Sequence, residues 1–411
     1  MRHIYTCVDI GSDTIKVVVC ELYHGRYNLL ATSCVQSNGI KKGLITDVEL
    51  AKNSIKNAFS KAESMLGFKI NKTIAIVPSY YSDFKMIKGT ININSTDFKI
   101  TGNDVIEVLQ ESMKSEQLNE KEMLTIMPID FVIDDDVTKE PIGKTGKTLS
   151  ARAIMVSTPK KNIYSVISLL NSVGIEVVDI SLGCIGDIYA LKNKEADNCV
   201  SAVVNIGSEK TEVSLYNKGI VLKHSIINMG SKNVDNDIAY MYKLDSLTAR
   251  TLKETFALAH RDSASLNEVK EVRNKNGDMI KINQYEISEI VSSRLEELLT
   301  SVNHELNSMA SHKPDYIFVT GGITNMTNFN QICREKLRKC AIIGNVNLIG
   351  LRNNKFSATI GNIIYFVNKL RLKGKNYSMI SSEEMEILET PKKNSNQDSV
   401  LGKFVEYFFG E

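Results

Sequence analysis

The stretch VDIGSDTIKVVV (residues 8–19) recurs 196 residues later as VNIGSEKTEVSL (residues 204–215), and the two copies align without a gap. Each copy contains an apolar predicted strand, the tripeptide Ile-Gly-Ser, a charged turn and a second predicted strand. A turn with a glycine (Gly25 or Gly219) and a third predicted strand then follow. Because this unit occurs in both halves of the chain, the sequence predicts two domains of similar fold.

The turn between the first two strands of each copy is a candidate phosphate site. Gly11 and Gly207 leave the backbone without a covering side chain, so anionic oxygens can approach its N–H groups. Ser12 and Ser208 add hydroxyl donors beside these glycines. Two such turns that face each other across a cleft would hold the phosphates of one nucleotide. The alternative is that both are ordinary hairpins, but their recurrence in register favours the nucleotide.

Other residues are expected to line the same cleft. Asp9 precedes the first turn and is placed to hold Mg²⁺ through water, while Lys16 is placed to neutralise a phosphate. The pair Gly321-Gly322 ends a predicted strand and permits close contact with a flat base or its sugar. Lys253 belongs to a segment that would bring it within reach of the base or the ribose.

Composition excludes several other classes of protein. The chain has 411 residues, more than one core usually serves, and its net charge of +2 gives no argument for nucleic-acid binding. No apolar run approaches the length of a transmembrane helix, and the N-terminus lacks the pattern of a signal peptide. Seven scattered cysteines without CxxC, and six histidines without HExxH, argue against structural zinc, disulfides and a catalytic metal. We therefore expect a cytosolic protein with reduced thiols.

The sequence GKTGKT (residues 143–148) is similar to a phosphate-binding P-loop but lacks one of its requirements. The P-loop motif needs a further glycine separated by four residues from its Gly-Lys-Thr, and this chain has Pro141 at that position. The segment follows a run of acidic residues and leads into a predicted strand (149–156). We interpret it as a hairpin turn.

The C-terminal part of the chain changes character twice. Residues 371–399 mix charges with Ser, Asn and Gly and predict a flexible linker. Apolar residues then recur at spacings of three, four and one, which predicts an amphipathic helix over 400–411. The alternative is that this helix packs on the protein's own body, although docking would not need a long linker. The expected membrane-binding residues are Leu401, Phe404, Val405, Phe408 and Phe409.

These motifs resemble those of the actin/Hsp70/sugar-kinase superfamily and, within it, those of the FtsA family of bacterial cell-division proteins. VDIGSDTIK resembles the first phosphate motif, VNIGSEKTEVSLY the second, and VTGGITNM (319–326) the adenosine motif. Residues 128–161, with the pattern Pro-Ile-Gly-x-x-Gly-x-x-Leu, resemble the end of the subdomain inserted in FtsA. The terminal SVLGKFVEYFFGE (399–411) resembles the FtsA membrane-targeting helix, so the resemblance covers nearly the whole chain.

The resemblance implies an α/β protein with a two-domain actin-like ATPase fold, an inserted α+β subdomain (1C) and a C-terminal amphipathic helix. Two predicted helices with Gly186 and Gly361 would cross between the halves, where small residues let the backbones approach. The implied division of the chain is subdomain 1A over 1–82 and 163–197, subdomain 1C over 83–162, subdomain 2A over 198–230 and 315–370, subdomain 2B over 231–314, the linker over 371–399 and the helix over 400–411.

The resemblance also implies a function. A member of this family binds ATP with Mg²⁺ between its halves, polymerises, and tethers the FtsZ ring to the inner face of the cytoplasmic membrane at the division site. Its partners would be FtsZ (through residues 231–313), other division proteins (through subdomain 1C), a second copy of the chain and the membrane surface. The matched nucleotide-binding residues are Asp9, Gly11, Ser12, Lys16, Asn205, Gly207, Ser208, Lys210, Thr211, Gly230, Lys253, Gly321 and Gly322.

Three positions depart from the family pattern. The family usually has Asp at the position of Asn205, a second glycine at Ser231 and Glu at Arg250. Asn205 removes a carboxylate near the metal and the attacking water, so we expect at most a weak ATPase. Two other functions remain open: a small-molecule kinase of the same superfamily, which would need a catalytic carboxylate near the second turn, and a pilus-assembly relative of FtsA, which shares the insert.

Overall fold

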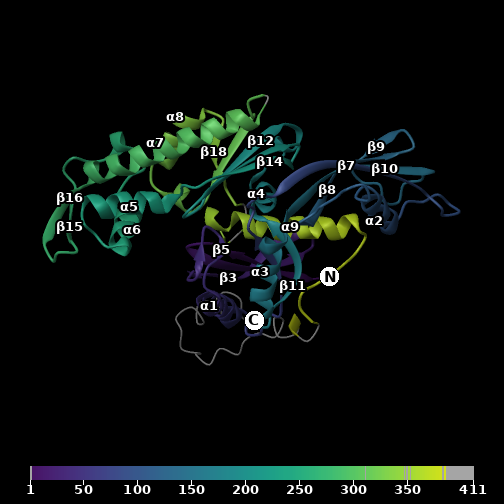
Figure 1. The fold of residues 1–411 in the computed structure, drawn as a ribbon, viewed down its shortest axis with the longest axis horizontal. Coiled ribbons are helices and arrows are strands. Elements are labelled where there is room, and N and C mark those ends of the chain that lie inside the picture. Colours follow the sequence, from purple (N-terminus) through teal and green to yellow (C-terminus); the bar gives the residue numbers. More distant parts are fainter. Residues whose placement is uncertain are drawn as a thin grey trace, which may run out of the picture.

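Each copy of the repeated sequence forms part of a five-stranded sheet (Figure 1). In this computed structural model the described residues are 2–381, except 311, 347, 349 and 352, together with 384 and 385. The sheet of the first half has the order β11-β6-β1-β2-β3, and that of the second half the order β14-β13-β12-β17-β18. The two copies supply β1 (His3–Ile10), β2 (Thr14–Tyr23) and β3 (Arg26–Gln36), and β12 (Val200–Ile206), β13 (Thr211–Asn217) and β14 (Ile220–Ile227).

The two hairpins have the same register. Asp9 pairs with Lys16 across β1 and β2, and Asn205 pairs with Glu212 across β12 and β13. Each sheet also contains parallel strands, which the chain reaches through longer crossover connections. The expectation of two similarly built halves is confirmed. These parallel strands are β6 (Lys72–Val77) and β11 (Glu176–Leu182) in the first half, and β17 (Tyr316–Thr320) and β18 (Ala341–Ile343) in the second.

Two helices pack against each other between the sheets: α4 (Gly183–Leu191) and α9 (Ser357–Leu372). A Cβ on Gly361 would overlap the carbonyl oxygen of Gly186, and a Cβ on Gly186 would overlap that of Ala358. The backbones of the two helices therefore touch, as predicted from their glycines. A larger side chain at either glycine would force the helices apart.

The outer face of the first half is covered by helices. The helix α1 (Val48–Leu66) begins at Asp47, whose carboxylate accepts the N–H of Leu50, and ends at Gly67 in the left-handed conformation (φ 89°). It packs on β2 and β3, while α3 (Lys160–Asn171) packs on β6 and β11. A short hairpin, β4 (Ile40–Lys41) and β5 (Leu44–Ile45), precedes α1.

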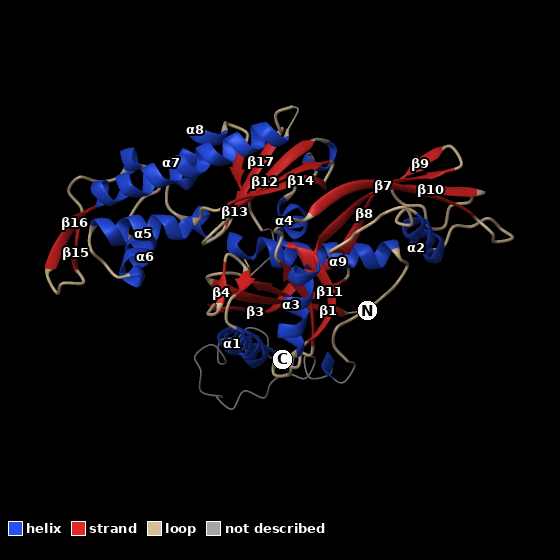
Figure 2. Ribbon diagram, in the orientation of Figure 1, coloured by secondary structure: helices blue, strands red, loops and turns tan. Residues whose placement is uncertain are grey.

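An inserted unit extends from the first half, at the right of Figure 2. Its sheet has the order β7-β10-β8-β9 and is covered by one helix. The segment 143–148 is not the tight hairpin turn expected from the sequence, because β9 and β10 both pair with β8 and not with each other. It is a longer loop that lies against residues 93–100, through bonds such as Gly143 N–H to the Ile100 carbonyl (2.9 Å). The elements are β7 (Asp83–Asn92), α2 (Gly102–Glu111), β8 (Lys121–Ile133), β9 (Asp136–Thr138) and β10 (Thr148–Pro159).

A helical arm extends from the second half on the opposite side of the molecule (Figure 1). Asp245 caps its α6 by accepting the N–H groups of Leu247 and Thr248, and Asn283 caps α7 in the same way. The arm consists of α5 (Ser231–Met241), α6 (Ser246–Thr255), β15 (Val269–Arg273), β16 (Met279–Asn283) and α7 (Gln284–Met309), and the second half also contains α8 (Phe329–Leu337). The 3₁₀ turns are η1 (Ala196–Asn198), η2 (Arg261–Ser263), η3 (Gly322–Asn325) and η4 (Asn354–Phe356).

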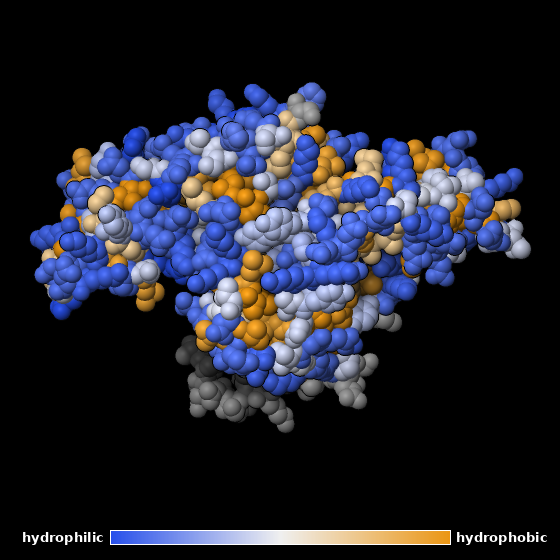
Figure 3. Space-filling model, viewed as in Figure 1, coloured by the Kyte–Doolittle hydropathy of each residue, from blue (hydrophilic) through white to orange (hydrophobic). Residues whose placement is uncertain are grey.

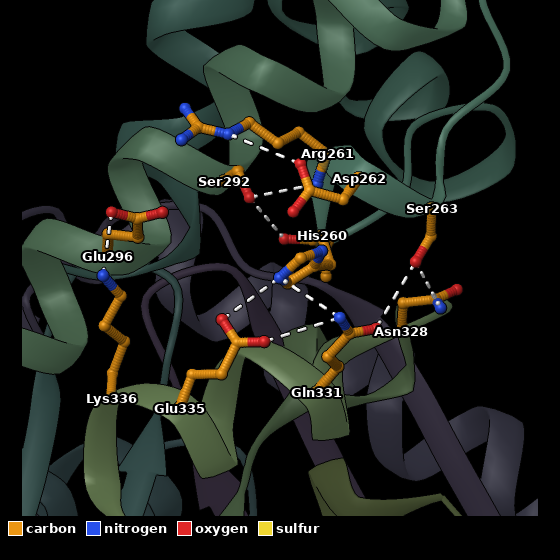
Figure 4. Close-up of polar contacts among 11 residues, drawn as sticks. His260, Arg261, Asp262, Ser263, Ser292, Glu296, Asn328, Gln331, Glu335 and Lys336 are labelled. Carbon is orange, nitrogen blue, oxygen red and sulfur yellow. Dashed lines mark hydrogen bonds and ion pairs between the residues drawn. The ribbon is translucent and has the colours of Figure 1, made fainter.

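A polar cluster fastens the chain after α6 to α8 (Figure 4). His260 Nε2 lies 3.1 Å from Glu335 Oε2 and 3.3 Å from the amide nitrogen of Gln331. The Asn328 amide donates to Ser263 Oγ at 3.0 Å. The arm is therefore tied to the sheet domain of the second half by side chains as well as by the chain itself.

The predicted linker is wrong over its first part. The helix α9 continues to Leu372, and Met379 is buried, with its N–H donating to the Ile4 carbonyl at 2.9 Å. Ile4 N–H in turn donates to Ser378 Oγ at 3.1 Å. Tyr377 and Met379 pack their apolar side chains on the core of the first half, and Ser378 and Met379 hydrogen-bond to Ile4 of β1.

The predicted membrane-binding helix, residues 400–411, lies outside the described residues. Among the described helices, none is long and apolar enough to cross a bilayer. On the face seen in Figure 3, hydrophilic side chains predominate and apolar side chains form separate small groups.

Candidate functional site

A cavity with a volume of about 560 Å³ lies between the two halves. Both hairpin turns line it, with Gly11 and Ser12 on one side and Gly207 and Ser208 on the other. The first and second copies of the repeat therefore meet at one cavity. Of the predicted nucleotide residues, those that line it are Asp9, Gly11, Ser12, Lys16, Asn205, Gly207, Ser208, Lys210, Lys253, Gly321 and Gly322.

The two turns have the same internal geometry. Gly11 N–H donates to the Thr14 carbonyl at 3.2 Å, and Gly207 N–H donates to the Lys210 carbonyl at 2.9 Å. A Cβ at Gly11 or Gly207 would lie 2.8 or 2.9 Å from the same carbonyl oxygens. The glycines are thus needed to close the turns, so their own N–H groups are used within the hairpins. A phosphate would be bound by the groups that follow them.

The hydroxyls beside these glycines are suited to anions. Ser12 Oγ accepts the N–H of Gly43 at 2.7 Å, and its own O–H hydrogen-bonds to the Glu209 carboxylate, which a phosphate would replace as acceptor. Ser208 Oγ is buried and has no hydrogen-bond partner in the described structure. Because a buried hydroxyl without a partner is costly, Ser208 fits a site that is completed by a bound acceptor.

Each hairpin also places a lysine in the cavity wall. Lys16 Nζ lies 2.7 Å from Asp9 Oδ2, and Lys210 Nζ lies 2.6 Å from Glu212 Oε1. Burial by itself would lower the pKa of both lysines, but the adjacent carboxylates outweigh it and raise both pKa values. Both lysines are therefore charged, and each is committed to a carboxylate.

Glu212 is a cavity residue that the sequence reasoning missed. It occupies the position in the second copy that Lys16 occupies in the first, so the alignment of the copies contained the signal. Its Oε1 also accepts a hydrogen bond from Ser79 of the first half at 2.6 Å. Burial by itself would raise the pKa of Glu212, but Lys210 and the other polar neighbours outweigh it and lower the pKa to about 2. So low a pKa makes Glu212 a weak proton acceptor.

Asn205 does not leave its surroundings without a carboxylate. Its amide donates to Oδ2 of Asp187 in α4 at 2.7 Å, and Ser357 of α9 donates to the other carboxylate oxygen at 2.6 Å. Asp187 is buried, and that burial raises its pKa to about 7 despite these two hydrogen bonds. This acid, also missed from the sequence, connects the second hairpin to both crossing helices. It does not line the cavity.

The helical arm contributes a third ion pair, which is more deeply buried than the first two. Lys253 is 4% exposed, and its Nζ lies 2.6 Å from Asp235 Oδ1 of α5. Lys253 therefore lines the cavity with its charge already neutralised. Arg250, one helical turn earlier, also lines the cavity.

The remaining glycines and Thr211 have different roles. Gly321 has a φ of 106° and packs against Ile206, where a Cβ would overlap the carbonyl oxygen, while a Cβ on Gly322 would meet open space. Gly230 packs its backbone against the second turn, and the Thr211 hydroxyl donates to the Met229 carbonyl at 2.8 Å. The structure brings neither Gly230 nor Thr211 into the cavity lining.

The fold and the cavity together define a class. Solved structures with the same overall fold include the one titled "PilM-PilN type IV pilus biogenesis complex" (TM-score 0.61, 14% identity, 88% of this chain and 98% of that chain). Another is titled "Crystal structure of MreB5 of Spiroplasma citri bound to ADP" (TM-score 0.55, 12% identity, 90% and 98%). The chain thus has the actin-like ATPase fold, as expected.

Sequence comparisons identify the family within this class. The model described as "Cell division protein FtsA" matches residues 202–361, and that described as "SHS2 domain inserted in FTSA" matches residues 83–157, together more than half of the chain. Proteins named cell division protein FtsA match along nearly the whole chain, from Bacillus subtilis strain 168 (26% identity, 93% of this chain and 88% of that protein) and Enterococcus faecalis (22%, 98% and 98%). The chain belongs to the FtsA family of cell-division proteins.

Proposed function

We propose that this chain binds ATP with Mg²⁺ in the cavity between its halves and acts as a membrane tether for the FtsZ ring. The observation that carries the nucleotide proposal is the meeting of two hairpin turns, one from each half, at a single cavity. The unpartnered Ser208 hydroxyl in its wall supports a bound acceptor. The MreB5 structure of the same fold, titled as bound to ADP, adds support from a neighbour.

The residues present fit a nucleotide whose metal is held indirectly. Within the described chain, no group of three or more His, Cys, Asp or Glu side chains is arranged to hold a metal ion. Asp9 gives one carboxylate oxygen to Lys16. In our proposal its other oxygen holds Mg²⁺ through water, and the metal supplies charge neutralisation for the phosphates. The hydroxyls of Ser12 and Ser208 would bind the phosphates, and Gly322 would lie against the adenosine.

We further propose that hydrolysis is slow. Asp9 and Glu212, the carboxylates that the two hairpins place in the cavity wall, are each paired with a lysine. The pKa of Glu212 is lowered to about 2, so this group accepts a proton poorly. The position next to the second turn carries an amide, Asn205. ATP would then act by holding the halves together rather than by rapid turnover.

The proposed tether needs a membrane contact and a partner. Residues 400–411 have the sequence pattern of an amphipathic helix, with Phe404 and Phe408 as the largest apolar side chains. Membership of a cell-division family supports FtsZ as the partner, which we propose binds the arm of residues 231–314. It also supports the assembly of the chain into a filament on the membrane. The inserted unit would then be available for other division proteins at the division site.

The test combines vesicles, nucleotide and FtsZ. Full-length chain should pellet with liposomes and bring FtsZ with it, and a chain that ends at residue 399 should do neither. Isothermal titration calorimetry should show Mg-ATP binding to both forms, because the truncation leaves the cavity intact. A full-length chain that binds no ATP would overturn the nucleotide proposal. Failure to pellet with liposomes would overturn the tether.

A pilus-assembly adaptor is the second candidate, because a structure titled as a PilM–PilN pilus complex shares the fold over 88% of the chain. The FtsA family models and relatives favour the division role. Co-sedimentation with FtsZ polymers distinguishes the two, since a pilus adaptor should not bind FtsZ.

A further inference from the structure

The tip of each hairpin turn carries an acidic residue at the same position of the repeat, Asp13 in the first copy and Glu209 in the second. Both line the cavity next to the serines of the turns. An acidic side chain at the mouth of a phosphate site opposes the binding of an anion unless its charge is offset. The partners of these two acids therefore matter for any anionic ligand.

Asp13 is bound by a residue of the opposite half. Arg250 of α6 donates to Asp13 from both terminal nitrogens, at 2.7 and 3.3 Å. Each side chain of this pair is 29% exposed, so the pair is only partly accessible to water. A two-bond contact between a guanidinium and a carboxylate in such a setting is among the stronger polar contacts in proteins.

Glu209 makes the reciprocal contact. Its Oε2 accepts the N–H of Lys42, in the β4–β5 turn of the first half, at 2.7 Å. Its Oε1 accepts a bond from Lys232 of its own half at 2.8 Å. The next residue of the β4–β5 turn, Gly43, donates to Ser12 Oγ at 2.7 Å. That turn therefore contacts both hairpin tips.

Other contacts hold Arg250 and its helix α6 in place within the second half. The chain after α6 is fastened to α8 by the cluster around His260 and Glu335 (Figure 4). Arg250 also lies against Asp235 of α5, with Nε and Oδ2 3.5 Å apart. Because α6 cannot move freely on its own half, an opening of the cavity has to separate Arg250 from Asp13.

We propose that the Arg250–Asp13 ion pair and the Lys42–Glu209 hydrogen bond close the mouth of the cavity and slow the release of its nucleotide. We call them the cross-cleft contacts. Arg250 is in this view a positioning residue: it offsets the charge of Asp13 beside the phosphates and joins the two halves. The claim about nucleotide release rests on the proposed function, whereas the closure itself does not.

The test measures closure and release separately. Hydrogen–deuterium exchange of the nucleotide-free chain reports closure, at residues 12–14 and 40–45. Release is measured by displacing a fluorescent methylanthraniloyl-ATP with excess ATP. We expect Arg250→Glu to increase exchange at both segments and to speed release roughly tenfold or more, because it replaces attraction with repulsion. Arg250→Gln should have a smaller effect in the same direction.

The matched control is Arg273→Glu, which makes the same charge change at an exposed position of β15. It should leave both readouts unchanged. The double variant that swaps the two residues, Asp13→Arg with Arg250→Asp (the exchanged pair), should show slower hydrogen–deuterium exchange than Arg250→Asp alone. Thermal unfolding followed by circular dichroism checks that each variant is folded.

Each outcome decides a separate point. Unchanged hydrogen exchange in folded Arg250→Glu would overturn the closure, as would failure of the exchanged pair to restore it. Increased exchange with an unchanged release rate would overturn the control of release. Increased exchange in a chain that binds no fluorescent ATP would support the closure while refuting the proposed function.

Discussion

In the first hairpin the residues that face each other at the cavity are Asp9 and Lys16, whereas in the second they are Asn205 and Glu212. The first pair is self-contained, because the lysine and the carboxylate neutralise each other within one hairpin. The second pair also depends on other elements: Asn205 on Asp187 of α4, and Glu212 on Ser79 of the first half in addition to Lys210 of its own hairpin. The same backbone therefore supports a local charge pair in one copy and a network between elements in the other.

This difference suggests distinct roles for the two copies. A self-contained pair tolerates movement of the halves, because no bond within it crosses the cavity. The network of the second copy reaches both crossing helices and the first half, so it changes when the halves move. A movement of the halves would therefore break contacts of Asn205 and Glu212 and leave the Asp9–Lys16 pair intact.

The largest effect is expected when the network of the second hairpin loses its carboxylate. Glu212→Ala should lower the free energy of unfolding by about 3 kcal/mol, because it leaves the Lys210 charge, whose side chain is only 19% exposed, without its partner. Urea unfolding at neutral pH measures this change. The double variant Glu212→Leu with Lys210→Met removes both charges and should be closer to wild type. Equal losses for the single and double variants would contradict the importance of the pair.

A somewhat smaller effect is expected at the amide of the second hairpin. Asn205→Asp places a carboxylate against that of Asp187 and should destabilise the protein by about 2–3 kcal/mol. The exchanged variant Asn205→Asp with Asp187→Asn keeps one amide and one carboxylate and should lie within about 1 kcal/mol of wild type. If the exchanged variant is as unstable as Asn205→Asp, the Asn205–Asp187 hydrogen bond is not what stabilises this region.

The self-contained pair of the first hairpin should affect binding more than stability. Lys16→Met removes a charged partner of the phosphates and should weaken Mg-ATP binding by roughly ten- to a hundredfold, the equivalent of about 1.5–3 kcal/mol. The loss of stability should be smaller than for Glu212→Ala, because Glu212 also binds Ser79 of the first half, whereas Lys16 pairs with Asp9 within one hairpin. Isothermal titration calorimetry measures the change in affinity, and urea unfolding of the same preparation measures the change in stability. A larger effect on stability than on affinity would reverse the roles given to the hairpins.

The smallest effect concerns the pH dependence of stability. The pKa of Asp187 is raised to about 7 in the folded chain, above its value in the unfolded chain. The stabilisation from this group is therefore complete below the unfolded pKa and is lost as the pH rises through about 7. Asp187→Asn should thus lose less stability than wild type between pH 5 and pH 8. Parallel unfolding curves for the two proteins across this range would contradict the raised pKa.

Much of the fold could be predicted from the sequence because its determinants are local. The alternation of Val and Ile with turn residues predicts the strands of both hairpins, and Gly67 marks the end of α1. The close contact of α4 with α9 was predictable because only small residues permit touching backbones. The path of residues 143–148 and the packing of Met379 were not, because both depend on elements distant in the sequence.

The sequence by itself determined that two copies of one hairpin exist, with glycines that close their turns and serines beside them, since turn chemistry acts over a few residues. Only the tertiary structure decided which charges meet. Asp187, Arg250 and Ser79 come from separate elements, and their contacts with Asn205, Asp13 and Glu212 exist because the two halves fold against each other. Electrostatic partners depend on distances of a few ångströms between distant parts of the chain, and sequence spacing alone cannot specify those distances.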